Sequence, residues 1–208
     1  MRTKLIAISV IVCALALTIT GALLYHRYSG NVEAIMYRLR TTGPLTVHHT
    51  ADGDTITINP RFGKPLSVRL LGINTPELEH KNRRVEEECF GKEAAAYVTK
   101  LVEDKVVSLD FDPLKSVSED HDRLLGYIYV YPGYWSYWFG WGSIDLNLHL
   151  IEKGYAEEWL YQSRYTRASE FLAAEQKAKA ENVGGWKACP DFKKHPRTPA
   201  RKKGKKRA

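Results

Sequence analysis

The stretch VRLLGINTPE, Val68–Glu77, ends a strand-like run with a turn rich in polar groups. Alternation of Val, Arg and Leu predicts a strand, which Gly72 and Pro76 interrupt. The last four residues of the stretch supply an amide, a hydroxyl, a proline and a carboxylate. Asn-Thr-Pro is also ordinary turn chemistry, because a residue before proline avoids the helical region. Other segments therefore have to decide whether this turn is structural or functional.

The order of the predicted elements indicates an α+β domain over residues 45–190. Segments rich in Val, Ile and Thr predict short strands, and segments with helical spacing predict three helices. The predicted strands fall within residues 45–60, 66–73, 105–113 and 123–132, and the predicted helices within 85–104, 143–159 and 167–186. About five short strands with helices between and after them fit a small barrel with helices packed on it.

A segment without any charge, Leu5–Tyr25, follows the first four residues. As a helix it is about 30 Å long, which matches the hydrocarbon core of a bilayer. It exceeds the usual apolar region of a secretory signal, and no clear A-x-A cleavage site follows. We predict a single transmembrane helix within residues 1–28, in preference to a cleaved signal that would release the protein, and a linker at 29–44. Basic residues flank the segment on both sides, so the positive-inside rule is nearly balanced.

Residues 191–208 form a basic tail, in which nine Lys and Arg residues follow Asp191. Subtracting these nine charges from the net charge of +7 leaves −2 for the rest of the chain. A segment of Lys, Arg, Pro and Gly buries too little apolar surface to fold, so we expect a disordered tail. Nucleic acid, anionic lipid or an anionic cell-wall polymer would suit it as a partner, and a solubilising role fits equally well.

The three cysteines divide between the apolar segment and the predicted domain. Cys13 lies in the apolar segment, whereas Cys89 and Cys189 lie far apart in the domain. Two is the number needed for one disulfide, which an exported domain would permit. Neither cysteine belongs to a CxxC or Cys/His pattern, which argues against a zinc site.

Two carboxylates surround one glycine in DGDT, residues 52–55. The pattern is a turn signal, and it also suits a hard cation. A strand pair could bring Asp54 beside Asn74 and the carbonyl of Thr75. Calcium and magnesium take oxygen ligands of these kinds.

Two arginines, Arg69 and Arg123, stand in apolar strand contexts. An arginine in such a run is usually paired or functional, because its charge is costly to bury. A planar guanidinium binds phosphate through two parallel hydrogen bonds, and it can equally pair with a carboxylate such as Glu77.

Together these segments resemble the staphylococcal nuclease family, the thermonucleases, from about Leu45 to Trp186. The segments that carry the resemblance are DGDT, VRLLGINTPE, FGKEAAAYVTKLV, DRLLGYIYV, LNLHLIEKGYA and AEQKAKAENVGGW. Each is weak alone, and the set in this order is highly specific. The resemblance implies a five-stranded oligonucleotide-binding (OB) barrel with three helices. It also implies calcium-dependent hydrolysis of DNA and RNA phosphodiesters that leaves 3′-phosphate ends.

The resemblance assigns roles to individual residues. Arg69 resembles the first arginine that clamps the phosphate, and Arg123 the second, which stabilises the developing charge and the leaving oxygen. Glu77 resembles the glutamate that positions or deprotonates the attacking water. The implied calcium ligands are Asp54, Asn74 and the backbone carbonyl of Thr75.

Three departures from the family pattern are visible. Asn74 stands where the family most often has a second carboxylate, so we expect weaker calcium binding. The segment SEDHD before Arg123 lacks the family's Tyr-Gly. The aromatic pair that stacks on a nucleotide base in the family has no clear counterpart here. Tyr161 or Tyr165 suits that role, and it is an equal alternative that these are ordinary core or surface tyrosines.

An aromatic insertion, Tyr131–Gly142, stands where the family has a tight hairpin. It contains three tryptophans, one phenylalanine and three tyrosines, together with one proline and three glycines. Aromatic residues partition to the membrane interface, and they also stack on single-stranded bases. A loop that folds over its own domain is the third alternative.

These observations predict a monomeric, calcium-dependent nuclease, tethered to a membrane with its nuclease domain outside the cytoplasm. Release by signal cleavage is the alternative location. The alternative function is a non-catalytic, membrane-tethered OB barrel that binds nucleic acid, with chemistry lost through Asn74. In the family barrel the segments that carry Cys89 and Cys189 could meet, so we also expect a disulfide between them.

Overall fold

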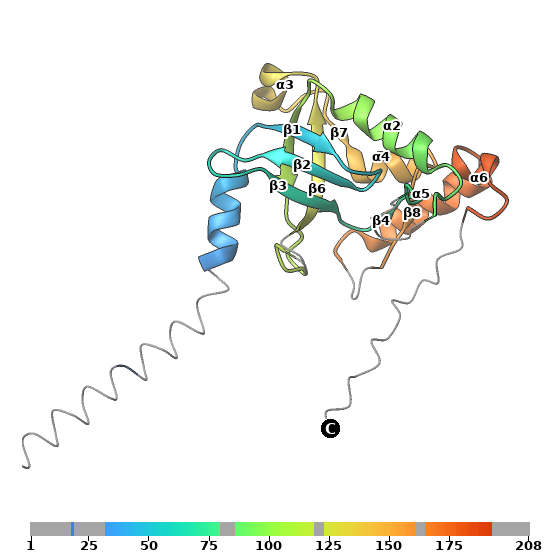
Figure 1. Cartoon of the computed structure of the whole chain (residues 1–208), viewed down its shortest axis with the longest axis horizontal. Helices are drawn as coiled ribbons and strands as arrows, with labels where there is room; N and C mark the ends of the chain where they lie inside the picture. The colour runs from blue at the N-terminus through green and yellow to red at the C-terminus, as the bar shows by residue number, and fades with distance from the viewer. Residues whose placement is uncertain (1–17, 19–31, 80–85, 119–122, 161–164, 193–208) are drawn as a thin grey trace, which may run out of the picture. The chain divides into compact units, whose positions relative to one another are not determined.

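Five strands close into a barrel in the computed structural model, which describes residues 18, 32–79, 86–118, 123–160 and 165–192 (Figure 1). The strands of the barrel are β1 (Leu45–Thr50), β2 (Thr55–Asn59), β3 (Leu66–Leu70), β5 (Val106–Asp110) and β6 (Leu124–Tyr131). They are ordered β3-β2-β1-β5-β6, and a parallel pairing of β3 with β6 closes the ring. The expected α+β class and five-stranded barrel are therefore confirmed. Strand β7 (Ile144–Asp145) pairs with β6 and extends the barrel sheet. Strands β4 (Ile73–Asn74) and β8 (Glu157–Glu158) form a separate two-stranded sheet.

The barrel core follows from the alternation that the sequence shows. In β3 every second side chain is buried, which is the two-residue period of a strand with one apolar face. Branched aliphatic side chains from all five strands fill the interior: Leu45, Ile56, Ile58, Val68, Leu70, Val107, Leu124 and Ile128. Their close packing makes the barrel a rigid support for the polar turns at its rim.

One polar side chain, Asn147, holds the closure of the barrel. Its amide nitrogen donates to the carbonyl oxygens of Leu71 at 2.9 Å and Gly126 at 3.2 Å. Its amide oxygen accepts from the Ile128 N–H at 3.0 Å. Because Asn147 is fully buried, these bonds supply the polar partners that the β3–β6 junction would otherwise lack.

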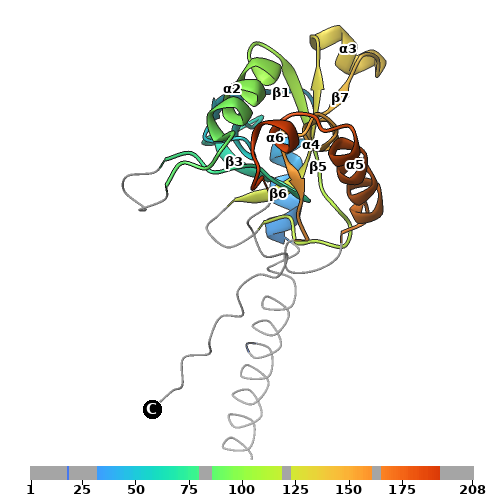
Figure 2. The same ribbon diagram turned by 90° about the vertical axis from the view of Figure 1, so that its right-hand side faces the viewer.

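Helices cover the barrel and bring distant segments together (Figures 1 and 2). Their bounds are α2 (Gly91–Val102), α3 (Tyr134–Phe139), α4 (Leu146–Glu152), α5 (Ala168–Ala180) and α6 (Gly185–Ala188). The three expected helices correspond to α2, α4 and α5, whereas α3 forms within the aromatic insertion. Ala94, Val98 and Val102 are buried along one face of α2, as a period of 3.6 residues requires. Leu150 of α4 and Phe171 of α5 are fully buried.

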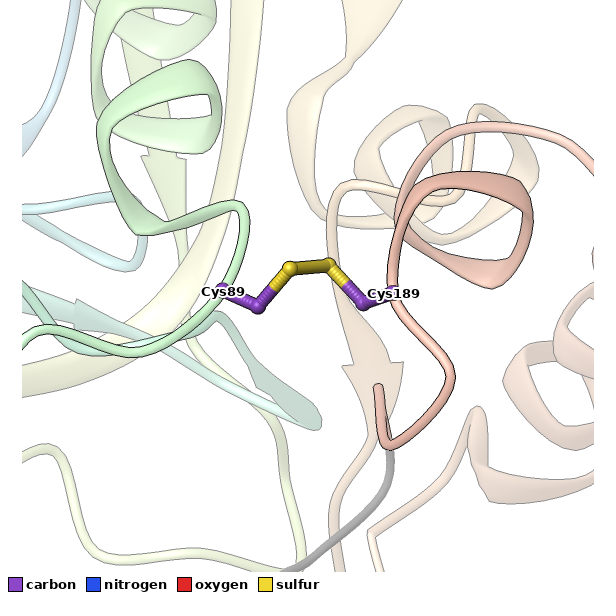
Figure 3. Close-up of a disulfide and its surroundings, with 2 residues drawn as sticks. All are labelled: Cys89 and Cys189. Carbon is purple, nitrogen blue, oxygen red and sulfur yellow. A yellow bond between two sulfur atoms is a disulfide. The ribbon is translucent and has the colours of Figure 1, made fainter.

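A disulfide joins Cys89, just before α2, to Cys189, just after α6, as the sequence led us to expect (Figure 3). The two Cα atoms are 6.1 Å apart, and the bond links positions separated by 100 residues.

The predicted membrane anchor lies almost entirely outside the described residues. Residues 32–41 are helical, within the segment predicted as a linker. None of the helices in the described part of the chain is long and apolar enough to cross a bilayer. Most of the predicted basic tail, from residue 193 onward, also lies outside the described part.

Candidate nuclease site

Two glycines allow the turns of the site to approach each other. A Cβ atom on Gly53 would meet the Thr75 side chain at 2.6 Å, so only glycine lets DGDT pack against NTPE. Gly72 has a φ of 81°, a left-handed conformation that glycine adopts without strain. A Cβ atom there would lie 2.7 Å from the ring of Tyr165. The glycines of both motifs are therefore required by close packing.

Asp54, Arg69 and Asn74 meet at this rim of the barrel. The β2–β3 register places Thr55 opposite Arg69, and the Arg69 guanidinium forms an ion pair with the Asp54 carboxylate. Arg69 Nη2 also donates to Asn74 Oδ1 at 3.3 Å. The Thr75 N–H donates to Asp54 Oδ2 at 3.0 Å. The sequence-predicted calcium ligands and the predicted phosphate clamp are thus in direct contact.

Asp52 belongs to the same cluster, although the sequence analysis singled out only Asp54. Burial, together with the charge of Asp54, raises the pKa of Asp52 to about 7, while Arg69 acts in the opposite direction. Glu77 also raises the pKa of Asp52, so its carboxylate shares the same electrostatic environment. The second aspartate of DGDT was the available signal for this residue.

Glu88 holds the backbone of Glu77 in place. The Glu77 N–H donates to Glu88 Oε2 at 3.0 Å, and the Glu88 N–H donates to the Glu77 carbonyl at 3.0 Å. Gly91 closes the other side, because a Cβ atom there would lie 2.6 Å from the Glu77 carbonyl. Cys89 of the disulfide follows Glu88 directly. Nothing local in the sequence marks Glu88, since its partner Glu77 lies 11 positions earlier in the chain.

Glu157 fixes the orientation of the Asn74 amide. The β4–β8 pair places the two residues opposite each other, and Asn74 Nδ2 donates to Glu157 Oε1 at 3.4 Å. Glu157 is only 4% exposed. The carboxyl oxygen accepts this hydrogen bond from the NH₂ end of the amide, and Oδ1 is left facing Arg69. Sequence reasoning missed Glu157, which lies in an AEEW segment without a motif.

Arg123 directly precedes β6. The parallel register pairs Val68 with Leu124 and Arg69 with Leu125. Arg123 therefore lies just before the strand that pairs with the strand of Arg69, two positions before Leu125, the partner of Arg69. The closure of the barrel brings together the segments that carry the two predicted phosphate-binding arginines.

The prediction that Tyr165 stacks on a substrate base is wrong. Tyr165 is 2% exposed, and its hydroxyl donates to Glu158 Oε1 at 3.0 Å and the Gly72 carbonyl at 3.3 Å. Its ring lies edge-on to that of Phe171. Tyr165 therefore supports the Gly72 turn from within the core, which is the alternative that the sequence left open. Tyr161 lies outside the described residues.

The chemistry of the rim fits a calcium ion. Among the described residues, no group of three or more His, Cys, Asp and Glu side chains is placed to hold a metal. The predicted set contains a single carboxylate, with an amide oxygen and a backbone carbonyl, and all are donors that calcium accepts. Burial is the main cause of the raised pKa of Asp52, and the negative charges of Asp54 and Glu77 raise it further. A divalent cation would offset the repulsion among these carboxylates.

A hollow of about 580 Å³ opens next to Asn74, beside the disulfide. Its lining is strongly acidic: Glu86, Glu87, Glu88, Glu157 and Asp191. A polyanionic strand would be repelled there.

Comparison with known proteins points to one family. The sequence model described as Staphylococcal nuclease homologue matches residues 67–188, more than half of the chain. The chain belongs to the staphylococcal nuclease family. An uncharacterized protein of Bacillus anthracis is 30% identical over 156 residues, which cover 72% of this chain and 65% of that protein.

Two further relatives carry nuclease names. The thermonuclease of Staphylococcus hyicus is 26% identical, over 65% of this chain and 70% of its own length. An uncharacterized endonuclease of Haemophilus influenzae is 26% identical, over 65% of this chain and 62% of its own length. The family therefore supports a nuclease, and substrate and metal preference are matters for a proposal.

Proposed function

We propose that this protein is a calcium-dependent endonuclease that hydrolyses phosphodiester bonds in DNA and RNA and leaves 3′-phosphate ends. The observation that carries the proposal is the contact of Arg69 with both Asp54 and Asn74. It places a two-pronged phosphate binder directly beside the proposed ligands of a hard cation. A structural ion pair alone would not need the neighbouring Asp52, Glu77 and Arg123.

Arg69 and Arg123 bind and polarise the phosphate. A guanidinium donates two parallel hydrogen bonds to phosphate oxygens and remains charged at every physiological pH. Two such groups offset the negative charge of the diester and the added charge of the transition state. Loss of one preorganised contact of this kind typically slows catalysis about 10²–10³-fold.

Glu77 orients the attacking water and accepts its proton. The hydroxide oxygen forms a bond to phosphorus, and the bond between phosphorus and the 5′ oxygen breaks. Arg123 stabilises the departing oxygen, which takes a proton from water and becomes a 5′-hydroxyl. The backbone contacts of Glu77 with Glu88 hold the carboxylate-bearing residue in position for this role.

Asp54, Asn74 and the Thr75 carbonyl would hold the calcium ion. When bound, the ion supplies Lewis acidity toward a phosphate oxygen and lowers the pKa of bound water. Arg69 then exchanges its contacts with Asp54 and Asn74 for contacts with the substrate phosphate. The Thr75 N–H stays on the Asp54 carboxylate and preserves its orientation.

The proposal is tested with supercoiled plasmid and single-stranded RNA in calcium or in chelator. We expect cleavage only with calcium, and a loss of about 10²-fold or more in rate for Arg69→Ala, Arg123→Ala or Glu77→Gln. Arg61→Ala is the matched control, because Arg61 is an exposed arginine outside the site. Labelling of the product ends distinguishes 3′-phosphate from 5′-phosphate. Equal rates for wild type and all three site variants would refute the mechanism.

The rival function is a non-catalytic, membrane-tethered barrel that binds nucleic acid. The neutral Asn74 favours it, because it removes one charged ligand. The same experiment separates the two: a binding protein would retain affinity for single strands and show no calcium-dependent cleavage.

We further propose that the domain works outside the cytoplasm. The Cys89–Cys189 disulfide supports this location, since such bonds persist mainly in oxidising compartments. The apolar segment Leu5–Tyr25 supports tethering to a membrane. Carbonate extraction of membranes, followed by protease treatment of intact cells, distinguishes a tethered domain from a released one.

A further inference from the structure

Five aromatic side chains stand out from the barrel in and just after α3: Tyr134, Trp135, Trp138, Phe139 and Trp141. We call them the aromatic projection. Trp135 and Phe139 are 73% and 72% exposed, and Trp141 and Trp138 are 64% and 63% exposed. Figure 2 shows α3 extending beyond the barrel beside β7. Such a concentration of exposed aromatic surface on a small domain marks an interaction site.

The segment is built to present these side chains outward. Gly133 and Ser136 close the start of α3: Gly133 N–H donates to Ser136 Oγ at 3.0 Å, and that hydroxyl donates to the Gly133 carbonyl at 2.7 Å. The ring of Tyr137 packs edge-on against Tyr131 of the barrel. One side of the helix is thus anchored, and the aromatic projection occupies the other. This arrangement overturns the alternative in which the whole insertion folds over its own domain.

The composition of the insertion argues against nucleic acid as the partner. Residues 131–142 contain no lysine or arginine. Affinity for nucleic acid comes largely from neutralising phosphates, and single-strand binding combines stacking with a positively charged groove. A lipid interface has no such requirement, because Trp and Tyr settle among headgroups without a charged partner.

The length of chain before the barrel keeps a bilayer within reach. Leu5–Tyr25 is uncharged and long enough to span a membrane. Because residues 32–41 are helical, the chain between Tyr25 and Arg40 reaches at most about 40 Å. We propose that the aromatic projection inserts into the headgroup region of the bilayer that holds this segment. The proposal does not depend on nuclease activity.

Docking there would leave the candidate site accessible. The aromatic projection follows the far end of β6, whereas the partner of Arg69 is Leu125 near its start. The strand between Leu125 and Tyr131 is about 20 Å long at 3.3 Å per residue. The aromatic projection can therefore contact lipid while the rim with Asp54 and Arg69 faces a substrate.

The test uses the full chain in vesicles of phosphatidylcholine, some brominated near the top of the acyl chains. Neutral lipid removes attraction of the basic tail. All five tryptophans lie outside Leu5–Tyr25, so tryptophan fluorescence does not report on the apolar segment. Two variants, used as fluorescence reporters, separate the tryptophans of the aromatic projection from the others. Trp159→Phe with Trp186→Phe leaves only the three projection tryptophans, and Trp135→Phe with Trp138→Phe and Trp141→Phe leaves only the two others. Matching far-UV circular dichroism verifies that both reporters fold.

We expect brominated lipid to quench the first reporter strongly and the second hardly at all, with blue-shifted emission in the first. Three outcomes overturn the proposal. Red, unquenched emission shows a projection left in water. Blue, unquenched emission shows that another protein surface, such as a second copy, covers it. Quenching by added oligothymidylate in place of brominated lipid shows a platform for bases.

Discussion

Asn74→Asp should destabilise the metal-free protein. The sequence alone suggests that this change restores a charged calcium ligand. In the structure, however, Asn74 Nδ2 lies 3.4 Å from Oε1 of the buried Glu157. An aspartate would replace the donor with a second carboxylate, so the variant loses a hydrogen bond and gains a repulsion.

The size of the repulsion follows from the distance. Two unit charges 3.4 Å apart repel by about 1 kcal/mol in water and by about 5 kcal/mol at an effective dielectric constant of 20. Arg69 lies beside Asn74 and offsets part of this energy. We therefore expect the free energy of unfolding in chelator to fall by about 1–4 kcal/mol.

The assay is urea denaturation of four proteins in chelator: wild type, Asn74→Asp, Glu157→Gln and the double variant. In the double variant a glutamine amide can donate to the new carboxylate, so stability should recover relative to Asn74→Asp. Calorimetric calcium titration of the same set should give the tightest binding for the double variant. It combines the charged ligand at 74 with no opposing charge at 157.

Two results would refute this reasoning. One is a urea midpoint for Asn74→Asp in chelator that equals that of the wild type. The other is a coupling energy between the two positions within about 0.5 kcal/mol of zero, which is the additivity expected of independent sites.

Three further predictions concern stability. Replacing Cys89 and Cys189 with alanine opens a loop of 100 residues. By the chain-entropy relation, urea denaturation should then show a free energy of unfolding that is lower by about 3–5 kcal/mol. An unchanged urea midpoint would contradict this prediction. Gly72→Ala should lower the free energy of unfolding by at least about 1–2 kcal/mol, because alanine is strained in the left-handed conformation of this residue. It should also slow cleavage, because the added Cβ displaces either the turn or Tyr165. Wild-type stability and rate would show that the turn is not constrained. Asp112→Asn should lower the free energy of unfolding at neutral pH by about 1–3 kcal/mol. The reason is that the Asp112 carboxylate accepts hydrogen bonds from the Tyr127 hydroxyl at 2.6 Å and from the Thr166 N–H at 2.8 Å. Burial acts to raise the pKa of Asp112, but these hydrogen bonds lower it overall, so its stabilisation is present above the unfolded pKa of about 3.9 and is lost as the pH falls through the lower folded value. Acid unfolding of Asp112→Asn should accordingly depend less steeply on pH below about 4, and identical acid transitions would contradict the assignment.

Local sequence patterns predicted most strands of the barrel and some residues of the candidate site. Strand alternation around Val68 and helical spacing around Val98 depend on neighbours within a few residues, so they can be recognised without a structure. The motifs DGDT and NTPE also could be recognised, because close-packed turns need glycine and proline at fixed places. Their direct contact through Gly53 and Thr75 required the folded chain.

The remaining features depend on pairings across long stretches of sequence. Glu157 meets Asn74 only because β8 pairs with β4, and Asn147 bridges two segments that meet at the β3–β6 junction. From the sequence, Tyr165 could stack on a base or be a core or surface residue, and packing against Gly72 buries it. The amphiphilic tyrosine ring suits either setting, so only tertiary structure could decide.

By itself, the sequence determined the family, the order of strands and helices, the residues of the two rim motifs and the presence of an apolar N-terminal segment. Tertiary structure decided which charges face each other at the rim and which aromatic side chains are exposed. The physical reason is range: propensity and periodicity act over a few residues, whereas burial and electrostatic pairing depend on the three-dimensional approach of distant segments.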